Sequence, residues 1–322
     1  MELREYMSGD EEEILNLFHL AFKKPLSKAF WEWRFKYNPF LKNPMINLMW
    51  DGNTMAGHYA VSASQIMYKG QPFLSSLSGT TMTHPNYEGK GIFTKLALSL
   101  YDRIAQDYGI VSVLGFPNQF SHYGLVKKIG WTDVEIVPVF RIQADLLTSS
   151  CDSAEINTIQ EFNESHATFI QNCIADLGFE VYTDRSAKYL NWRYLQCPIN
   201  KYHCIEYKQY GEIKGIIIGK EYEIDGRHEI DVVDFFCNEE LNTLSLLFSS
   251  IKVFIEENHR VIPQYVNTWL SLRDRRHLEM ERLGFRIAPP LTYLCAKPFS
   301  IGIDDIKMAN KWYIAMGDSD VY

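Results

Sequence analysis

An internal repeat constrains the fold of this chain more than any other feature of its sequence. Three short landmarks occur twice, in the same order, at separations of 159, 158 and 154 residues. They are a Trp-Arg-aromatic triplet followed by proline (from Trp33 and Trp192), a glycine in strand-like sequence after a turn (Gly57 and Gly215), and a basic-apolar-Gly-aromatic motif (around Gly130 and Gly284). One short match would be chance, but three in order indicate two copies of one fold.

The length of 322 residues agrees with two domains of about 150 residues each. The segment from Leu147 to Ser153 is small and polar, as a linker should be. We therefore expect one domain over residues 1–146, a second over residues 154–300, and a C-terminal tail over residues 301–322. The tail is aromatic and then acidic, and either places Asp318 or Asp320 near a cationic acceptor or is an end without a role.

Composition narrows the class of protein. Apolar residues make up 46% of the chain and charged residues 22%, which is typical of a soluble globular protein. The net charge of −8 argues against broad binding to nucleic acid or to anionic membranes, because neutralising phosphates requires clustered Lys and Arg. No apolar run approaches the ~18 residues that span a bilayer, and the first ten residues lack the apolar core of a signal peptide.

The cysteines point to a reducing compartment. None of the six forms a C-x-x-C pair, and all lie in the second half: Cys151, Cys173, Cys197, Cys204, Cys237 and Cys295. This pattern indicates free thiols in the cytoplasm, with neither a metal site nor a disulfide framework. The oligomeric state is left open, and a homodimer is compatible with the sequence.

Apolar periodicity in the first half switches between helical and strand-like spacing. It predicts helices over residues 11–22, 29–37, 92–108 and 119–129, and strands over residues 45–50, 55–67, 73–83 and 110–114, with further strands after residue 131. The predicted order is helix, helix, three strands, a loop, helix, strand, helix and strand.

The loop between the third strand and the third helix has the properties of an anion site. Backbone N–H groups in the first turn of a helix lack internal partners, and that end of the helix dipole is positive, so a pyrophosphate can accept several of them. Gly89 and Gly91 let the backbone approach closely, and Lys90, Thr94 and Lys95 add charge or hydroxyl donors. The plain alternative is a strand-to-helix turn without a ligand.

Residues 83–93 resemble the acetyl-CoA loop of the GNAT acyltransferase superfamily, whose pattern is Gln/Arg-x-x-Gly-x-Gly/Ala. Gly91 fits the first glycine, whereas Glu88 stands where Gln or Arg is usual and Phe93 where Gly or Ala is usual. Glu88 is a poor neighbour for pyrophosphate unless it points away, so backbone N–H groups would do more of the binding. A short strand, Asn118, a helix and Gly130-Trp131 follow in the family's order.

The resemblance implies an α+β fold of two GNAT-like domains, each with a mixed, largely antiparallel sheet flanked by helices. It also implies a gap between two diverging strands that holds the pantetheine arm of acetyl-CoA or another acyl-CoA. The cofactor-binding residues it implies are Met82, Thr83, Glu88, Gly89, Lys90, Gly91, Ile92, Phe93, Thr94 and Asn118. Asn118 has a second interpretation as a simple helix cap.

Transfer of an acyl group from a thioester to an amine requires a base, donors for the oxyanion and an acid for the thiolate. The resemblance implies a tyrosine as the acid: counting forward from Asn118 favours Tyr123, whereas counting back from Gly130 reaches Val126. His84 is the candidate base, with His58 and Glu32 as open alternatives, and backbone N–H groups from Met82 to His84 are candidate oxyanion donors.

Trp33 and Arg34 precede the strands of the cleft, where the family often admits its acceptor. They either line a substrate pocket or only pack, and the repeat of this motif at Trp192-Arg193 favours packing.

The second half lacks a corresponding glycine loop. The matching region, residues 231–241, contains no glycine, and Glu239 and Glu240 precede the next helix, where they would repel a pyrophosphate. We expect a degenerate copy that supports the first.

The resemblance implies an N-acyltransferase that moves an acetyl or another short acyl group from acyl-CoA to the amine of a small molecule, such as an amino sugar or a polyamine-like compound. A non-catalytic acyl-CoA sensor or scaffold and an aminoacyl-transfer relative of the duplicated fold are the alternatives.

Overall fold

The computed structural model describes residues 1–148, 155–299 and 304–322. The described chain divides into two compact units, and each takes two stretches of sequence. Unit 1 holds residues 1–134 and 293–308, and unit 2 holds residues 135–292 and 309–322. Residues 149–153 of the expected linker, which include Cys151, lie outside the described residues, as do residues 301–303 of the expected tail.

The unit boundaries differ from a division at residue 146 because two late strands pair with distant sequence. Strand β6 (Thr132–Gln143) pairs through its residues 139–143 with β12 (Tyr265–Trp269) in unit 2. Strand β13 (Arg286–Pro298) pairs through its residues 295–298 with β5 (Ser112–Gly115) in unit 1. The boundaries of the units therefore follow from the pairing of strands that are distant in sequence, and not from the position of a linker.

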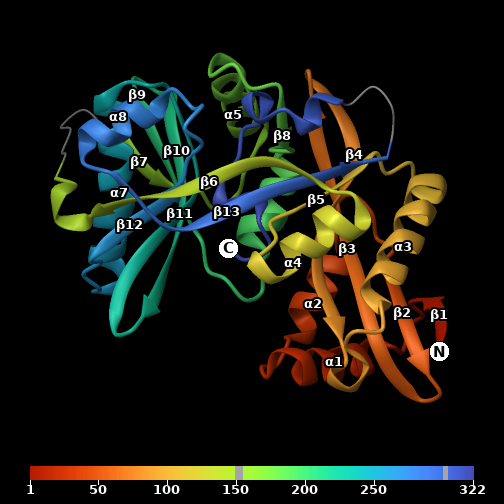
Figure 1. Ribbon diagram of the computed structural model, residues 1–322. Helices are drawn as coiled ribbons and strands as arrows, with labels where there is room; N and C mark the ends of the chain where they lie inside the picture. Colours follow the sequence, from red (N-terminus) through yellow and green to blue (C-terminus); the bar gives the residue numbers. More distant parts are fainter. Residues whose placement is uncertain (149–154, 300–303) are drawn as a thin grey trace. The chain divides into compact units, whose positions relative to one another are not determined.

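Unit 1 contains a mixed sheet (Figure 1). Among the strand pairs given above and below for its described residues, β4 and β5 run parallel and the others antiparallel. Its strand order is β1-β2-β3-β4-β5-β13. The strands not yet given are β1 (Glu2–Glu5), β2 (Met45–Asp51), β3 (Thr54–Tyr68) and β4 (Gln71–Thr83). The antiparallel neighbours β2–β3 and β3–β4 are joined by tight turns, as the glycines at residues 52 and 70 predict.

Helices cover both faces of this sheet. The helices of unit 1 are α1 (Glu11–Phe22), α2 (Lys28–Phe35), α3 (Ile92–Tyr108) and α4 (Gln119–Tyr123), and α4 continues as a π-helical turn (Gly124–Lys128). Apolar side chains of α3 pack with Tyr59 and Val61 of β3 in one core. Side chains of α1 and α2 pack with Ala60 and Met82 in another, because successive strand residues face opposite sides.

Unit 2 has a similar order of elements, with one additional short strand between its first two helices. Its strands are β6, β7 (Glu155–Thr158), β8 (Val181–Thr183), β9 (His203–Gln209), β10 (Glu212–Ile224), β11 (Arg227–Cys237) and β12, and its helices are α5 (Glu164–Asp176), α6 (Ala187–Leu190), α7 (Leu241–His259) and α8 (Arg276–Leu283). Along the sheet the order is β6-β12-β11-β10-β9-β7, and β11 and β12 form its parallel pair. A mixed, largely antiparallel sheet with flanking helices confirms the predicted α+β class.

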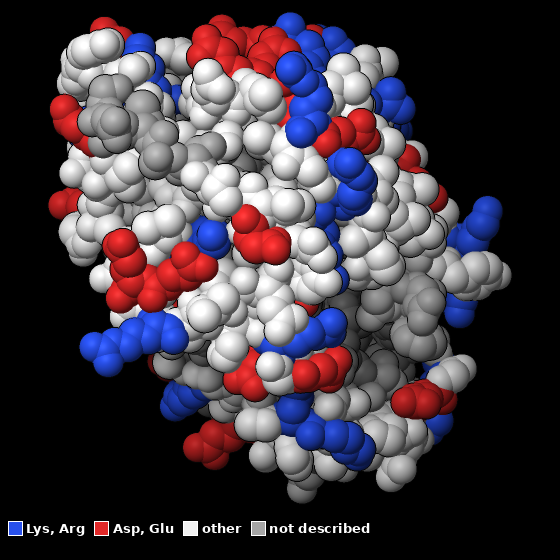
Figure 2. All heavy atoms as spheres, turned by 90° about the vertical axis from the view of Figure 1, so that its left-hand side faces the viewer, with Lys and Arg blue, Asp and Glu red and all other residues white. Residues whose placement is uncertain are grey.

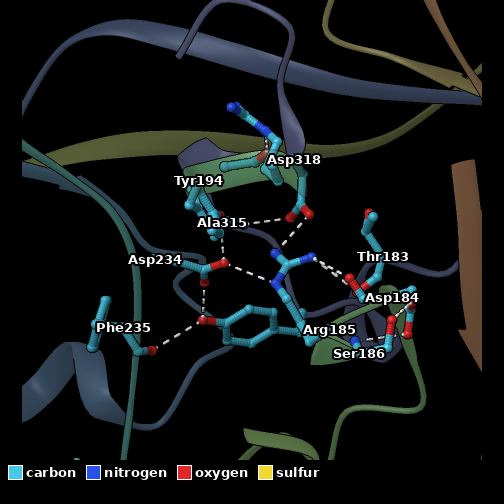
Figure 3. Close-up of polar contacts among 12 residues, drawn as sticks. Thr183, Asp184, Arg185, Ser186, Tyr194, Asp234, Phe235, Ala315 and Asp318 are labelled. Carbon is cyan, nitrogen blue, oxygen red and sulfur yellow. Dashed lines mark hydrogen bonds and ion pairs between the residues drawn. The ribbon is translucent and has the colours of Figure 1, made fainter. Parts of the chain in front are cut away.

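The end of the chain is fixed inside unit 2 by a buried polar network (Figure 3). The Arg185 guanidinium donates to Asp234 Oδ2 at 2.8 Å and to Asp318 Oδ1 at 2.7 Å. The hydroxyls of Tyr194 and Tyr313 each donate to Asp234 at 2.9 Å. Asp318 is therefore paired with a cation of its own chain, which removes it from the expected role beside a cationic acceptor.

The described surface carries charges of both signs, as the composition of the chain leads us to expect. In the described part of the face drawn in Figure 2, Lys and Arg side chains are interspersed with Asp and Glu. Among the described helices, none is long and apolar enough to span a bilayer.

Candidate functional site

The parallel strands β4 and β5 separate after a short contact. They pair only at Ser76 with Val113 and at Leu77 with Leu114, although β4 continues to Thr83. The edge of β4 beyond Leu77 therefore has no strand partner on this side among the described residues, because β5 ends at Gly115, and we call the space beside this edge the gap. Such an unpaired edge can bind an extended chain by backbone hydrogen bonds.

A β-bulge lies in β4 along this gap. His58 pairs with Met82 and Ala60 with Gly79, so β4 holds one more residue than β3 between these rungs. Thr80 has a φ of +58°, and its carbonyl accepts a hydrogen bond from His58 Nδ1 at 2.8 Å. Bulges of this kind bend a strand and re-aim its groups beside active sites.

His58 stabilises the bulge rather than serving as a base. Burial lowers the pKa of His58 to about 4, so the ring is neutral at pH 7. Its Nδ1 proton is donated to Thr80, and the side chain is inaccessible to solvent. A fully buried imidazole with so low a pKa is a poor acceptor for the proton of an amine, which disfavours this alternative for the base.

The loop after β4 presents unused backbone donors at the start of α3. A 3-10 turn (Pro85–Tyr87) precedes Glu88, and Gly89 and Gly91 have φ values of +74° and +71°. Within the described residues, the backbone N–H groups from Gly89 to Thr94 donate to no protein acceptor. No atom lies within 4 Å of a Cβ built on either glycine, so the space beside the loop is open.

The side chains of Lys90 in the loop and Phe93 in the first turn of α3 each contact an aromatic ring. The Phe93 ring contacts the edge of Tyr59 with centroids 5.7 Å apart and packs on the core under α3. The Lys90 ammonium lies 4.4 Å from the centroid of Tyr87. Phe93 therefore leaves the loop open although it replaces the small residue of the family pattern.

The remaining predicted cofactor residues near β4 can act only through their backbone or at the surface. Met82 and Ile92 are buried in the two cores, and Thr83 is half-buried and pairs with Gly57. The carboxylate of Glu88 is exposed. The His84 N–H donates to Ala56 O at 3.0 Å, which removes it from the candidate oxyanion donors.

His84 serves as a cap in this structure. Its Nδ1 accepts a hydrogen bond from the Asn86 N–H at 3.1 Å. The neutral ring therefore carries its proton on Nε2, and neither nitrogen has a free lone pair while that bond stands. Taking a proton from an amine would require the ring to release Asn86.

Asn118 caps the helix that follows β5, which was the second interpretation of this residue. Its Oδ1 accepts from the Ser121 N–H at 3.0 Å, and its carbonyl accepts from the His122 N–H at 3.0 Å. The residue is exposed at the C-terminal end of β5.

Tyr123 is the last residue of α4, and its side chain is 66% exposed. The π-helical turn that follows adds residues to the helix relative to regular α-helical spacing. The helix is therefore irregular between Asn118 and Gly130, the two positions from which the place of the acid was counted.

Trp33 and Arg34 are buried in the packing of α2, with 8% and 5% of their surface exposed. Trp33 stacks on Phe30 with centroids 5.4 Å apart, and the Arg34 guanidinium lies 5.7 Å from the Phe35 ring. These contacts agree with the packing interpretation and place neither side chain at the surface of unit 1. Glu32 is half-buried on the same helix.

A buried chain of hydroxyl groups, which the sequence did not reveal, supports the start of the gap. Trp131 Nε1 donates to the Tyr101 hydroxyl at 3.1 Å, and the Tyr101 and Tyr59 hydroxyls are 2.5 Å apart. The Tyr59 hydroxyl lies 2.9 Å from Ser78 Oγ, just past the last β4–β5 rung. Burial raises the pKa of Tyr59 to about 12, so the chain is neutral and acts as a rigid support.

The corresponding place in unit 2 has a different chemistry. A hollow of about 680 Å³ lies at the start of α7 and is lined by Asn238, Glu239, Glu240, Arg273, Arg275, His277, Leu278 and Glu279. The Arg275 guanidinium forms an ion pair with the Glu239 carboxylate at 3.1 Å, so its positive charge is already neutralised by a side chain of the protein. With acidic residues and no glycine before the helix, this site does not suit a pyrophosphate.

The features of unit 1 together define a class of protein. Two parallel strands whose pairing ends, a bulge beside the unpaired edge, and a helix start with unused N–H groups suit a cofactor with a phosphate end and an extended arm. This is the arrangement expected for an acyl-CoA-dependent transferase.

Comparison with known families agrees with this class. Residues 2–134 match the model of the acetyltransferase (GNAT) domain, and this part of the chain is a GNAT domain. No curated protein matches the sequence. The predicted resemblance is thereby confirmed for the first domain.

Solved structures extend the likeness of fold to nearly the whole chain. A GCN5-related N-acetyltransferase from Anabaena variabilis is 14% identical, with a TM-score of 0.71 over 93% of this chain and 73% of that one. One from Kribbella flavida is 13% identical, with a TM-score of 0.67 over 92% and 70%. Saccharomyces cerevisiae N-myristoyltransferase with bound myristoyl-CoA is 9% identical, with a TM-score of 0.60 over 92% and 82%.

Proposed function

We propose that this protein is an N-acyltransferase that moves an acetyl or another short acyl group from acyl-CoA to the amine of a small molecule. One observation carries the proposal: six successive backbone N–H groups, from Gly89 to Thr94, have no protein acceptor at the start of α3. A diphosphate is the ligand that such a row of donors suits best. An amino sugar or a polyamine-like compound is the proposed acceptor.

The cofactor would be held in two parts. Its diphosphate would accept from the loop amides, with Thr94 as a further donor. Its pantetheine arm would lie along the unpaired edge of β4 past Leu77 and hydrogen-bond to that backbone as an added strand. The thioester would then lie near the bulge at Thr80, where His58 and the hydroxyl chain keep the strand rigid.

The reaction is a direct transfer. The neutral amine nitrogen attacks the thioester carbon, a C–N bond forms, and the C–S bond breaks. The amine loses one proton, for which His84 and solvent water are the proposed acceptors. The thiolate gains one proton, which we assign to the exposed hydroxyl of Tyr123.

Two measurements on the full chain test this function together. Calorimetry with acetyl-CoA measures binding, and release of free thiol on a panel of small amines measures transfer. Binding with amine-dependent thiol release supports the enzyme. Binding without release on any amine favours an acyl-CoA sensor, and no binding of acetyl-CoA or longer acyl-CoAs excludes both.

The length of the acyl group is tested in the same assay. We expect acetyl-CoA to be used at least as well as longer acyl-CoAs, because the Phe93 ring and the Tyr59 side chain fill the space under the loop. Faster release from a long-chain thioester would replace the acetyl assignment and leave acyl transfer intact.

A further inference from the structure

Three potential metal ligands gather in unit 2, away from any residue assigned above. His203 lies on β9, Glu221 on β10, and His259 is the last residue of α7. One ligand atom of each lies within 4.8 Å of the others. No local pattern indicates this group, because its members are 18 and 38 residues apart in the sequence.

The fold explains why these side chains meet. His203 pairs with Gly219, so Glu221, two residues further along β10, faces the same side of the sheet. Helix α7 covers this side, since a Cβ on Gly219 would lie 3.1 Å from Ile251. His259, about two turns after Ile251, therefore ends the helix above the same pair of strands.

The donors form one compact set. Glu221 Oε1 pairs with His259 Nδ1 and lies 3.8 Å from His203 Nε2. The two imidazole rings stand nearly perpendicular, with centroids 4.7 Å apart. In a tetrahedral zinc site with bonds of about 2.1 Å, neighbouring ligand atoms are about 3.4 Å apart, which is close to the separation of His203 and Glu221.

An unsatisfied atom points to a missing partner. His203 is 6% exposed, and its Nε2 is buried without a hydrogen-bond partner among the described residues. A buried polar nitrogen left without a partner is destabilising and rare in native proteins, so such an atom calls for an explanation. A cation bound between the three side chains would satisfy it.

The proposed ligands can be reached from solvent. Side chains of Glu221 and His259 are 28% and 20% exposed, which leaves a route for an ion from solvent.

We propose that His203, Glu221 and His259 bind a divalent transition-metal ion of the zinc type. Two imidazole nitrogens and one carboxylate form a known ligand set for Zn²⁺, with the fourth position taken by water. The ion would tie the β9–β10 pair to the end of α7. This site uses no residue of the acyl-CoA site, so its test is independent of the proposed function.

A second group in unit 1 supplies a control. Asp133 Oδ1 there accepts from His122 Nε2 at 2.5 Å and from the Cys295 thiol at 3.2 Å. Asp133 Oδ1 therefore already has two donors without an ion, and burial raises the pKa of the Cys295 thiol, which disfavours the thiolate that a metal needs. We therefore expect His122→Gln to leave metal binding unchanged.

Calorimetric titration of Zn²⁺ into the full chain after chelator treatment tests the site, with Co²⁺ absorption as a report on four-coordinate geometry. We expect one equivalent of Zn²⁺ to bind. His259→Gln and His203→Gln should each weaken binding at least roughly tenfold, because losing even a residue that only hydrogen-bonds to a metal ligand lowers metal affinity by about that factor. His259 is partly exposed at a helix end, so we expect the His259→Gln variant to fold. It therefore keeps the test valid even if substitution of the buried His203 prevents folding.

The wild-type chain should also melt at a higher temperature with Zn²⁺, and His259→Gln should not. Absence of one-to-one binding would overturn the proposal. Undiminished binding in folded His259→Gln, or loss of binding in His122→Gln, would overturn it as well.

Discussion

The hydroxyl of Tyr123 is the single group on which the proposed proton transfer to the thiolate depends. Tyr123→Phe keeps the ring and removes the donor, so kcat for thiol release should fall roughly 100-fold with little change in KM. Tyr210, 89% exposed in a turn of unit 2, gives a matched variant, and Tyr210→Phe should keep the wild-type rate. Equal rates for both variants would remove Tyr123 from the mechanism.

His58 makes the stability of the chain depend on pH. Its pKa in the folded chain is about 4, below the 6.5 of an unperturbed histidine, because burial disfavours the charged ring. Between pH 6.5 and 4 the unfolded chain binds the proton and the folded chain does not, so stability from this group is present above pH 6.5 and falls as pH is lowered.

Urea unfolding at pH 7 and pH 4.5 measures this effect. The free energy of unfolding should fall by roughly 2–3 kcal/mol from this residue, and His58→Gln should remove that part of the difference. A variant with the same pH dependence as wild type would show that His58 is not the buried neutral ring described above.

Individual residues also show where sequence reasoning was sufficient. Gly89 and Gly91 mark a loop whose conformation depends on local backbone freedom, and the sequence located it correctly. The hydroxyl chain from Trp131 to Ser78 joins three elements, and no local pattern indicates which hydroxyls will meet. The burial of Trp33 and Arg34 likewise depends on packing that their own helix does not specify.

At the scale of elements, helix α3 offers a comparison between its two ends. Gly91 and Gly109 flank this helix with φ values of +71° and +64°, and neither has an atom within 4 Å of a Cβ built on it. An alanine at either position should destabilise the fold to a similar extent, by about 1 kcal/mol, because both require the left-handed region. Only Gly91 adjoins the open side of the loop.

Calorimetry on this pair separates binding from strain. Gly91→Ala should weaken acetyl-CoA binding at least roughly tenfold, because its methyl group occupies the approach of the diphosphate. Gly109→Ala should bind as wild type. Equal affinities would place the cofactor elsewhere.

Elements were predicted well where local periodicity decides them and less well where it does not. The spacing of apolar residues located α1, α3 and the strands β2 to β5 to within a few residues. The helix predicted over residues 119–129 instead changes to a π-helical turn after Tyr123, which apolar spacing alone does not indicate. Strand β1 is too short to carry a pattern.

At the scale of the whole molecule, the repeat predicted two copies of similar element order but not the division of the chain into units. Strands β6 and β13 each pair with sequence more than a hundred residues away. Such pairings depend on tertiary structure, and neither β-propensity nor turn residues indicate them.

The network around Arg185 predicts how strongly the end of the chain is held in unit 2. Arg185 and Asp234 are wholly buried, and removing the cation leaves Asp234 and Asp318 without a charge partner. Arg185→Met should lower the free energy of unfolding by about 3–5 kcal/mol. Arg282, whose side chain is 65% exposed beside Glu279, is the control, and Arg282→Met should cost less than about 1 kcal/mol.

Urea denaturation of both variants checks this expectation. Equal stabilities of Arg185→Met and wild type would mean that the ion pairs contribute nothing net, and that apolar packing alone fixes the final segment.

The account depends most on the free N–H groups between β4 and α3, and nuclear magnetic resonance of the ¹⁵N-labelled, deuterated chain observes them directly. On titration with acetyl-CoA, the amide signals of Gly89 and Gly91 should shift strongly as these groups donate to the diphosphate, while those of Gly211 and Gly226 in unit 2 stay in place. Saturable binding that leaves the Gly89 and Gly91 signals unmoved would contradict the central claim.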